Sequence, residues 1–220
     1  MIKKPNIIGV VGFAGSGKDT LARQIIDYGY ERFAFADTLK DMISIVFGWE
    51  RELMEGETLE SREWRETPDV WWEKKLNWYD EENMNMRSLF PRFTPRVAMQ
   101  LIGTDLFRRH FNDNIWILSL ENKIRNIEHV IISDCRFPNE IKMIKDKKGI
   151  LIRVDRGEKP DWYSVGVDAA NGNISAKNYL ISKKIHISEW SWLNQDIDVE
   201  VVNDGDPSHM IDAVKKIIKL

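Results

Sequence analysis

The sequence has a single cysteine, Cys135, so no disulfide bond can form within the chain. It also lacks a long hydrophobic run: the apolar stretch after the N-terminus covers only residues 7–11, too short for a signal peptide or a membrane span. Positive charge is not in excess, since 32 lysines and arginines stand against 35 aspartates and glutamates. We therefore expect a reducing, cytoplasmic location, with no membrane partner and no nucleic-acid polymer as partner.

Short apolar strands alternate with amphipathic helices along the chain. Strands are predicted at residues 7–11, 32–36, 129–134, 149–155 and 198–204. This alternation is typical of an α/β protein in which helices cover both faces of a parallel sheet. A length of 220 residues fits one such domain, 1–220, with a central five-stranded parallel sheet in a three-layer fold.

Two segments depart from this alternation. The first, at about 49–93, holds five tryptophans among dense charges. It is predicted to be an insertion, either a mobile, lid-like segment or a helical subdomain with the tryptophans in its own small core. The second, at about 156–195, contains several glycines and Pro160 and is predicted to be rich in loops.

A glycine-rich stretch, GFAGSGKDT at 12–20, lies between a predicted buried strand and a predicted helix. Gly12, Gly17 and Lys18 have the spacing of a G-x-x-x-x-G-K phosphate-binding loop. Together with Gly15, the two glycines would let the backbone turn tightly, so that amide groups surround an anion at the helix N-terminus. Lys18 would add a mobile charge for the β- and γ-phosphates. The stretch predicts binding of ATP or GTP.

Asp19 stands where this loop usually has the Ser or Thr that meets magnesium. A carboxylate there could orient a magnesium-bound water, leaving Thr20 available for phosphate. The sequence has no asparagine-or-threonine-lysine-x-aspartate motif for reading guanine, which disfavours a GTPase. A compact parallel sheet with an insertion fits a small-molecule kinase, since such enzymes must close over their substrate to keep water from the phosphate.

A second group of polar residues lies in ISDCRFPNEI, 132–141. Asp134 and Arg136 would share one face of the predicted strand, at the carboxyl end where α/β sheets bind ligands. Pro138 would open a helix and place Glu140 near the same crevice. Arg136 could grip the acceptor phosphate or the transferring group. Asp134 could hold magnesium through water or orient Arg136. The alternative is a structural salt bridge between Arg136 and one of these carboxylates.

These motifs belong to a larger ordered set. The chain resembles the phage-type deoxynucleoside monophosphate kinases, a branch of the P-loop nucleoside monophosphate kinase fold. The matching pieces are GSGKDT (15–20), FAFADTLKD (33–41), QLIGTDLFR (100–108), DNIWI (113–117), DCRFPNE (134–140), HISE (186–189) and VVNDG (201–205). The resemblance implies transfer of the ATP γ-phosphate to a deoxynucleoside monophosphate with Mg²⁺, and it implies that Asp19 belongs in this loop.

The resemblance also implies site residues. Those for ATP and magnesium are Ser16, Lys18, Asp19 and Thr20. Those for the acceptor nucleotide are Trp116, Asp134, Arg136 and Glu140. Trp116 could stack on a base, although helical periodicity alone would place it in the core.

Several weaker candidates complete the predicted site. Asp37 could contact the acceptor or only cap a helix, and Arg108 could reach a phosphate or be a surface charge. Asn203 could approach the adenine or form a plain turn. Any one of three arginines could close over the phosphates, and the sequence does not distinguish among them: Arg87, Arg92 and Arg96.

Two other functions fit the phosphate loop. One is a different small-molecule kinase, acting on dephospho-coenzyme A or phosphomevalonate. The other is a module that binds ATP without phosphorylating a small molecule. The resemblance also suggests a homodimer and a phage source, in which case the location would be the host cytoplasm.

Overall fold

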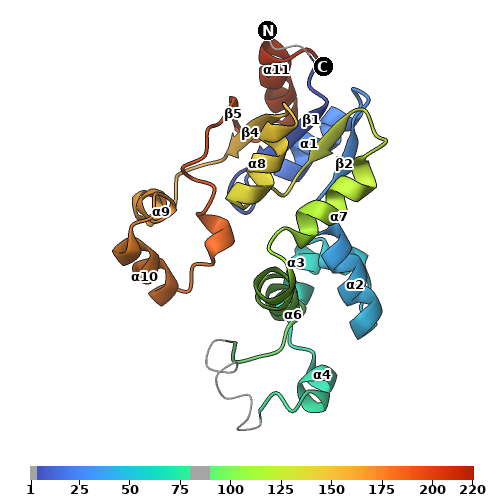
Figure 1. Cartoon of the computed structure of the whole chain (residues 1–220), viewed down its shortest axis with the longest axis vertical. Coiled ribbons are helices and arrows are strands. Elements are labelled where there is room, and N and C mark those ends of the chain that lie inside the picture. Colours follow the sequence, from blue (N-terminus) through green and yellow to red (C-terminus); the bar gives the residue numbers. More distant parts are fainter. Residues whose placement is uncertain (1–3, 80–89) are drawn as a thin grey trace. The chain divides into compact units, whose positions relative to one another are not determined.

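The structure, a computed structural model, describes residues 4–79 and 90–220 (Figure 1). The chain forms two compact units. The first consists of Met1–Phe35 and Leu120–Leu220, and the second of Ala36–Ser119. Among the described residues, no helix combines the length and the apolar character needed to cross a membrane.

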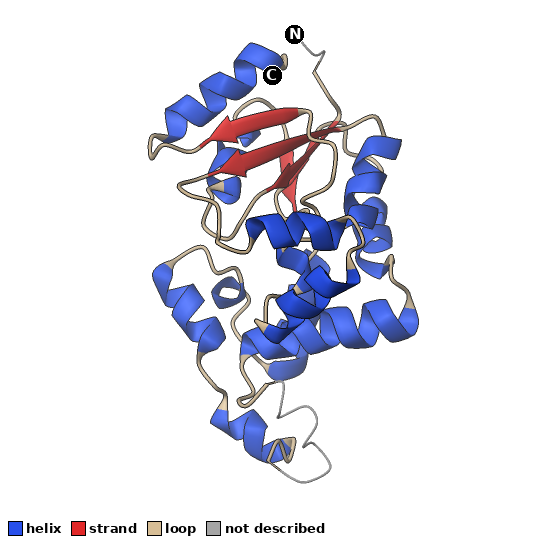
Figure 2. Cartoon of the chain, turned by 90° about the vertical axis from the view of Figure 1, so that its left-hand side faces the viewer, coloured by secondary structure: helices blue, strands red, loops and turns tan. Residues whose placement is uncertain are grey.

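The first unit is built on a sheet of parallel strands (Figure 2). Within the described residues the sheet has five strands, in the order β2-β3-β1-β4-β5. Their bounds are Ile7–Val11 for β1, Glu31–Phe33 for β2, Val130–Ile132 for β3, Ile150–Asp155 for β4 and Val199–Val202 for β5. All neighbouring strands run parallel, which confirms the predicted five-stranded parallel sheet.

Strand β1 lies at the centre of this sheet and is buried along its whole length. Ile8 pairs with Ile131 of β3 on one side and with Ile150 of β4 on the other. A strand covered on both faces is apolar on both faces, which made it recognisable in the sequence. Because the strands are parallel, the loops that follow them lie along one edge, where ligands bind in such sheets.

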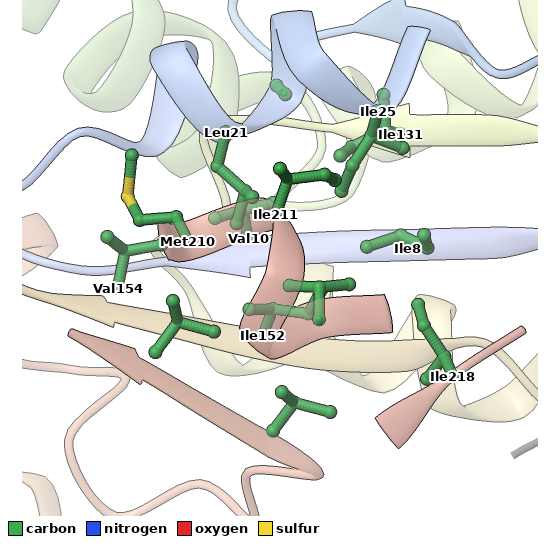
Figure 3. Packing of buried hydrophobic residues seen from close by; sticks show 14 of the residues in the cluster. Ile8, Val10, Leu21, Ile25, Ile131, Ile152, Val154, Met210, Ile211 and Ile218 are labelled. Carbon is green, nitrogen blue, oxygen red and sulfur yellow. The ribbon is translucent and has the colours of Figure 1, made fainter. Parts of the chain in front are cut away.

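One face of the sheet is covered by α1 (Lys18–Ile26) and α11 (Pro207–Ile217). Figure 3 shows Leu21 and Met210, from these two helices, packed with strand residues such as Ile152. All three side chains are fully buried. Burying a large aliphatic side chain stabilises a fold by about 1.5–3 kcal/mol, so this cluster is a main source of the unit's stability.

The opposite face is covered by α8 (Pro138–Asp146), which begins at the predicted proline. Gly9 of β1 allows the close approach of this helix. A Cβ atom at Gly9 would lie 2.3 Å from Cδ1 of Ile144, so any larger residue would force the Ile144 side chain to move. Helices therefore lie on both faces of the sheet, as predicted.

The segment predicted to be rich in loops, at about 156–195, contains two helices. They are α9 (Tyr163–Ala170) and α10 (Ile174–Ser182). They share a small core formed by Ala169, Ala176, Leu180 and Trp190. These two helices were not predicted, because glycine was taken as a sign of loops and here it also serves close packing. Gly166 lies inside α9, where a Cβ atom would come within 2.8 Å of Leu193.

The second unit is helical in its described residues (Figure 2). Its helices are α2 (Asp37–Phe47), η1 (Glu52–Met54), α3 (Leu59–Glu66), α4 (Val70–Lys75), α6 (Pro95–Gln100) and the π-helix η3 (Leu101–Phe111). The boundary with the first unit falls within α7 (Ile115–Ile124). Thr94 caps α6, as predicted. Gly103 of η3 permits close packing, since a Cβ atom there would lie 2.5 Å from Leu39.

The tryptophan-rich segment, 49–93, contributes to an aromatic core in this unit. The rings of Phe47 and Trp49 are stacked with centroids 4.5 Å apart. Phe93 lies 5.7 Å from the Phe47 ring and 5.0 Å from the Trp78 ring. Trp49 and Trp78 are both buried. In its described part the segment therefore forms short helices around tryptophans. This is the arrangement expected of a helical subdomain with the tryptophans in its own small core.

Candidate active site

The glycine-rich loop, residues 12–17, joins the end of β1 to the start of α1. Gly12 and Gly17 have φ angles of +148° and +105°, a region of backbone conformation that favours glycine. Neither position has room for a side chain: a Cβ at Gly12 would lie 2.4 Å from the Val154 carbonyl oxygen, and one at Gly17 would lie 2.4 Å from Nδ2 of Asn203. The turn therefore requires both glycines, and it leads into a helix N-terminus, where an anion is favoured.

Lys18 is buried at the start of α1 and turns back over the loop. Its Nζ donates hydrogen bonds to the carbonyl oxygens of Gly12 at 2.8 Å and Phe13 at 2.7 Å. Burial, followed by the positive charge of Arg136, lowers the pKa of Lys18 to about 8. A phosphate beside this ammonium group would offset both effects, because a negative charge favours the protonated lysine.

The other loop residues predicted for ATP and magnesium differ in their surroundings. Gly15, with a φ of +76°, faces open space. The Ser16 hydroxyl is buried, and no hydrogen-bond partner for it occurs in the described part of the chain. Asp19 pairs with Arg32 at 3.0 Å, and Thr20, next to it in the first turn of α1, is half-buried. A ligand oxygen at the loop would satisfy the Ser16 hydroxyl.

Two contacts from distant parts of the chain hold this loop in place. Asn203, just after β5, donates from Nδ2 to the Ser16 carbonyl at 2.8 Å and accepts from the Gly205 amide at 3.1 Å. The ring of Phe13 packs against three aromatic rings at 5.6, 6.2 and 5.2 Å, those of Trp162, Tyr163 and Trp192. Asn203 thus supports the loop backbone. Sequence reasoning did not identify this role, although the segment VVNDG (201–205) is one of those that resemble the kinase family.

The second predicted group lies in the loop that follows β3, residues 133–137. The prediction that Asp134 and Arg136 share a face of the strand was wrong, because β3 already ends at Ile132. Beyond it, the amides of Ser133 and Cys135 still donate to carbonyls of β2 and β1 at 3.1 and 3.2 Å. Oδ1 of Asp134 accepts a hydrogen bond from the Phe35 amide at 2.8 Å. Asp134 and Arg136 nevertheless lie at the carboxyl end of the strand, at the same edge of the sheet as the glycine-rich loop.

Glu140 is buried in the first turn of α8, the predicted position. Its Oε2 accepts hydrogen bonds from the amides of Arg136 at 2.8 Å and Phe137 at 3.0 Å. A carboxylate that accepts two backbone amides at a helix N-terminus fixes the path of the preceding loop. Glu140 therefore shapes the backbone that carries Arg136.

The Arg136 side chain forms an ion pair with a carboxylate that sequence reasoning did not link to it. Its Nη1 donates to Glu189 at 2.8 Å and lies 3.4 Å from the Ser188 hydroxyl. Glu189 ends the short 3₁₀ helix η4 (Ile187–Glu189). The predicted alternative, a salt bridge to one of the two nearby carboxylates, is therefore wrong about the partner. The sequence did point to this segment, since HISE (186–189), which contains Glu189, is one of those that resemble the kinase family.

Trp116 belongs to the second unit, in the part of α7 that precedes Leu120. Its indole Nε1 donates to the Gly103 carbonyl at 3.0 Å, and its ring lies 5.3 Å from that of Phe107. The side chain is buried. Within this unit Trp116 therefore has the contacts of a core residue, and its stacking on a base stays a prediction.

The second unit also contains Asp37 and Arg108. Asp37 is the first residue of α2, whose N-cap is Ala36, so it is not the predicted cap. It accepts from Arg51 at 3.4 Å. Arg108 pairs with Asp113 at 2.9 Å. Their predicted roles in acceptor binding stay predictions.

The arginines predicted to close over phosphates have carboxylate partners in the second unit. Arg92 forms two hydrogen bonds with the buried Glu73, at 2.8 and 3.0 Å. Arg96 pairs with Glu66. Arg87 lies outside the described residues. A role for Arg92 in closing would require it to leave a buried carboxylate, which is costly.

Two viral proteins are similar to this chain in sequence, although no protein-family model matches it. A deoxynucleoside-5′-monophosphate kinase of Escherichia phage T5 is 27% identical, over 70% of this chain and 79% of that protein. A protein of Acanthamoeba polyphaga mimivirus with the provisional name deoxynucleotide monophosphate kinase is 32% identical, over 68% of this chain and 74% of that protein.

Solved structures of two kinases are similar over nearly the whole chain. A shikimate kinase from Aquifex aeolicus VF5 has a TM-score of 0.40 and 11% identity, covering 96% of this chain and 94% of that one. A dephospho-CoA kinase from Campylobacter jejuni has a TM-score of 0.36 and 12% identity, covering 99% and 98%. Both TM-scores are below 0.5.

The parallel sheet, with its glycine-rich loop between β1 and α1, defines an α/β protein of the P-loop class. The two viral relatives then identify the family within this class. The chain belongs to the deoxynucleoside monophosphate kinase family. It is accordingly a phosphotransferase.

Proposed function

We propose that this protein transfers the γ-phosphate of ATP to a deoxynucleoside 5′-monophosphate, giving ADP and the deoxynucleoside diphosphate. The observation that carries this proposal is the placement of Lys18 and Arg136 in the loops that follow the paired strands β1 and β3, which the Cys135 amide joins at the Val10 carbonyl at 3.2 Å. At this separation the charge of Arg136 lowers the pKa of Lys18. Two cations held together beside a glycine-rich loop are unfavourable unless anions lie between or beside them. A donor and an acceptor phosphate supply such anions.

The donor side consists of the loop and the first turn of α1. The residues proposed to bind ATP are Gly12, Gly15, Ser16, Gly17, Lys18, Asp19 and Thr20. Two observations support this assignment: the Ser16 hydroxyl has no hydrogen-bond partner among the residues the structure describes, and the pKa of Lys18 is lowered. Lys18 would exchange its two carbonyl partners for phosphate oxygens, which are stronger acceptors because they are charged.

Magnesium fits the same residues. Asp19 and Thr20 offer oxygen atoms, which this hard cation prefers, and we propose that they hold it through water. In the described part of the chain, no group of three or more acidic, histidine or cysteine side chains is gathered as a metal site. The phosphates and water would thus supply the remaining ligands. When bound, magnesium neutralises charge on the β- and γ-phosphates.

The acceptor side is assigned to Arg136, with Asp134 and Glu140 shaping its loop. Phosphoryl transfer consists mainly of positioning and charge neutralisation. The oxygen of a nucleoside monophosphate is already anionic, so the reaction needs no strong general base. Arg136 would orient the acceptor phosphate, and Lys18 would stabilise charge on the transferring group.

The wider setting of this activity is also proposed. Small-molecule nucleotides are the expected partners. A homodimer, the lack of a nucleic-acid polymer as partner, and a location in the cytoplasm (of the host, for a phage protein) stay predictions.

The test is an ATP-coupled assay with each of the four deoxynucleoside monophosphates, and with dephospho-coenzyme A and phosphomevalonate. We expect ADP and a deoxynucleoside diphosphate from at least one of the four. Turnover of only the other two compounds would assign a different small-molecule kinase. ATP binding without any phosphorylated product would instead indicate a binding module.

A further inference from the structure

The ion pair between Arg136 and Glu189 joins two segments far apart in the sequence. Nη1 of Arg136 lies 2.8 Å from Oε1 of Glu189, and both side chains are partly exposed, at 39% and 29%. Exposed ion pairs contribute little to the stability of a fold. The loop of Arg136 lies against the end of β1, where the glycine-rich loop begins, since the Cys135 amide donates to the Val10 carbonyl at 3.2 Å. Both charges of the pair therefore act on the pKa of Lys18, the arginine lowering it and the glutamate raising it. The position of the pair suggests a role in the site more than in folding.

Glu189 binds only one nitrogen of the Arg136 guanidinium group, Nη1. Among the described residues, the contacts of Arg136 through its side chain are those of Nη1, with Glu189 and with the Ser188 hydroxyl. The Nε and Nη2 atoms have no hydrogen-bond partner there. These two atoms form the edge with which an arginine grips a carboxylate or phosphate in a bidentate manner.

The segment that carries Glu189 is itself firmly attached to the loop of Arg136. The Ser191 hydroxyl donates to the Arg136 carbonyl at 2.8 Å, a second link between the same segments. The flanking side chains of Trp190 and Trp192 are buried, at 5% and 2% exposure. Glu189 is therefore presented from a fixed backbone, as a residue that positions another group must be.

We propose that Glu189 is a positioning residue: it holds Nη1 of Arg136 so that the Nε–Nη2 edge is presented to the acceptor phosphate before the nucleotide binds. This inference rests on the proposed function. A long arginine side chain that is already ordered loses less conformational freedom when it binds its ligand. Glu189 also offsets the positive charge of Arg136 near Lys18, so that the two cations can be held together.

The first test compares Glu189→Ala with Glu189→Gln in steady-state assays at pH 7. We expect E189A to raise KM for the deoxynucleoside monophosphate by about tenfold or more, since small misplacements of binding groups cost up to about 100-fold. KM for ATP should change little. E189Q keeps an oxygen acceptor for Nη1 and should recover most of the loss. Glu200→Ala is the matched control: it removes a 2.9 Å pair with Arg153 in the same unit and should leave both constants unchanged.

The second test asks whether Glu189 acts through Arg136. In an Arg136→Ala background, E189A should have no further effect on kcat/KM, because the group it positions is gone. Equal losses in both backgrounds would show a merely structural role and overturn the proposal. The proposal would also be overturned if E189A left KM for the deoxynucleoside monophosphate unchanged while Arg136→Ala impaired the enzyme.

A third measurement does not depend on activity. The Nε–H signal of Arg136 in nitrogen-15 NMR, identified by its loss in Arg136→Ala, should report an ordered side chain in the nucleotide-free wild-type protein and in E189Q, and a mobile one in E189A under the same conditions. A mobile wild-type guanidinium would refute the inference. A wild-type protein that phosphorylates no deoxynucleotide would refute the proposed function instead.

Discussion

The glycine-rich loop and the loop 133–137 follow neighbouring strands of one sheet, yet they are held by different means. The first depends on glycine backbone angles and on Lys18, which binds the loop's own carbonyl groups. The second is held from outside, by Phe35 on one side and by Glu189 and Ser191 on the other. Asn203 also supports the first loop from outside. The difference is that the first loop adds its own glycine angles and lysine to this support, whereas loop 133–137 is positioned by contacts from other segments.

The two loops also differ in how their charge is compensated. Lys18 is buried and has a lowered pKa, so its charge is costly without a ligand. Arg136 is partly exposed and already has a carboxylate partner. We therefore expect changes at Lys18 to affect chemistry without a loss of stability, and changes around Arg136 to affect acceptor binding.

The largest effect is expected for Lys18→Met, which keeps the aliphatic stem and removes the charge. kcat/KM should fall by about 1,000-fold, as for the loss of a main electrostatic group in other active sites. The folded pKa of about 8 lies below the unfolded value of 10.5, so at pH 7 the lysine is charged in both states and its burial is unfavourable. The free energy of unfolding in urea should therefore not decrease. Near-normal phosphotransfer by this variant would contradict the assignment of the loop.

Arg136→Ala should have the next largest effect, a loss of about 100-fold in kcat/KM, seen mainly as a higher KM for the acceptor. Arg136→Lys should fall between this variant and the wild type, because lysine keeps the charge but not the planar fork. Circular dichroism and thermal unfolding should show an intact fold. A variant that fails to fold would instead support a structural role for the ion pair with Glu189.

Asn203→Ala tests the external support of the glycine-rich loop. Loss of its hydrogen bond to the Ser16 carbonyl should cost about 1 kcal/mol, which corresponds to roughly a fivefold weaker binding of ATP. Asn194→Ala is the matched control, because it removes an amide-to-carbonyl bond of 2.9 Å to Ala170, away from the loop. Equal ATP affinities in the two variants would show that the loop needs no such support.

The smallest effect concerns pH. Because the pKa of Lys18 is about 8 in the nucleotide-free protein, half of the lysine is neutral at that pH. The affinity for a non-hydrolysable ATP analogue should therefore fall roughly twofold between pH 7 and 8, and further above pH 8. In Lys18→Arg, which stays charged throughout this range, the profile should be flat. Calorimetric titration from pH 6.5 to 9 would measure both, and a flat wild-type profile would argue against a lowered pKa.

Several features of the fold could be predicted because their signals are local. The apolar run 7–11 indicated a buried central strand, and the pair Thr94–Pro95 indicated a helix start. The end of β3 was predicted at residue 134 but falls at Ile132. The Asp134 side chain there bonds the Phe35 amide, a partner that is distant in the sequence. The helix α9 was missed, because Gly166 serves close packing where a turn was expected.

The sequence by itself determined the phosphate loop, the parallel α/β fold and the residue types at the end of β3. These follow from short-range rules: glycine conformation, the periodicity of apolar residues and the spacing of a contiguous motif. Only the tertiary structure decided the partner of Arg136, the support of the loop by Asn203 and the backbone role of Glu140. Long-range pairing depends on which side chains the folded backbone brings within hydrogen-bond distance, and sequence spacing does not encode that distance.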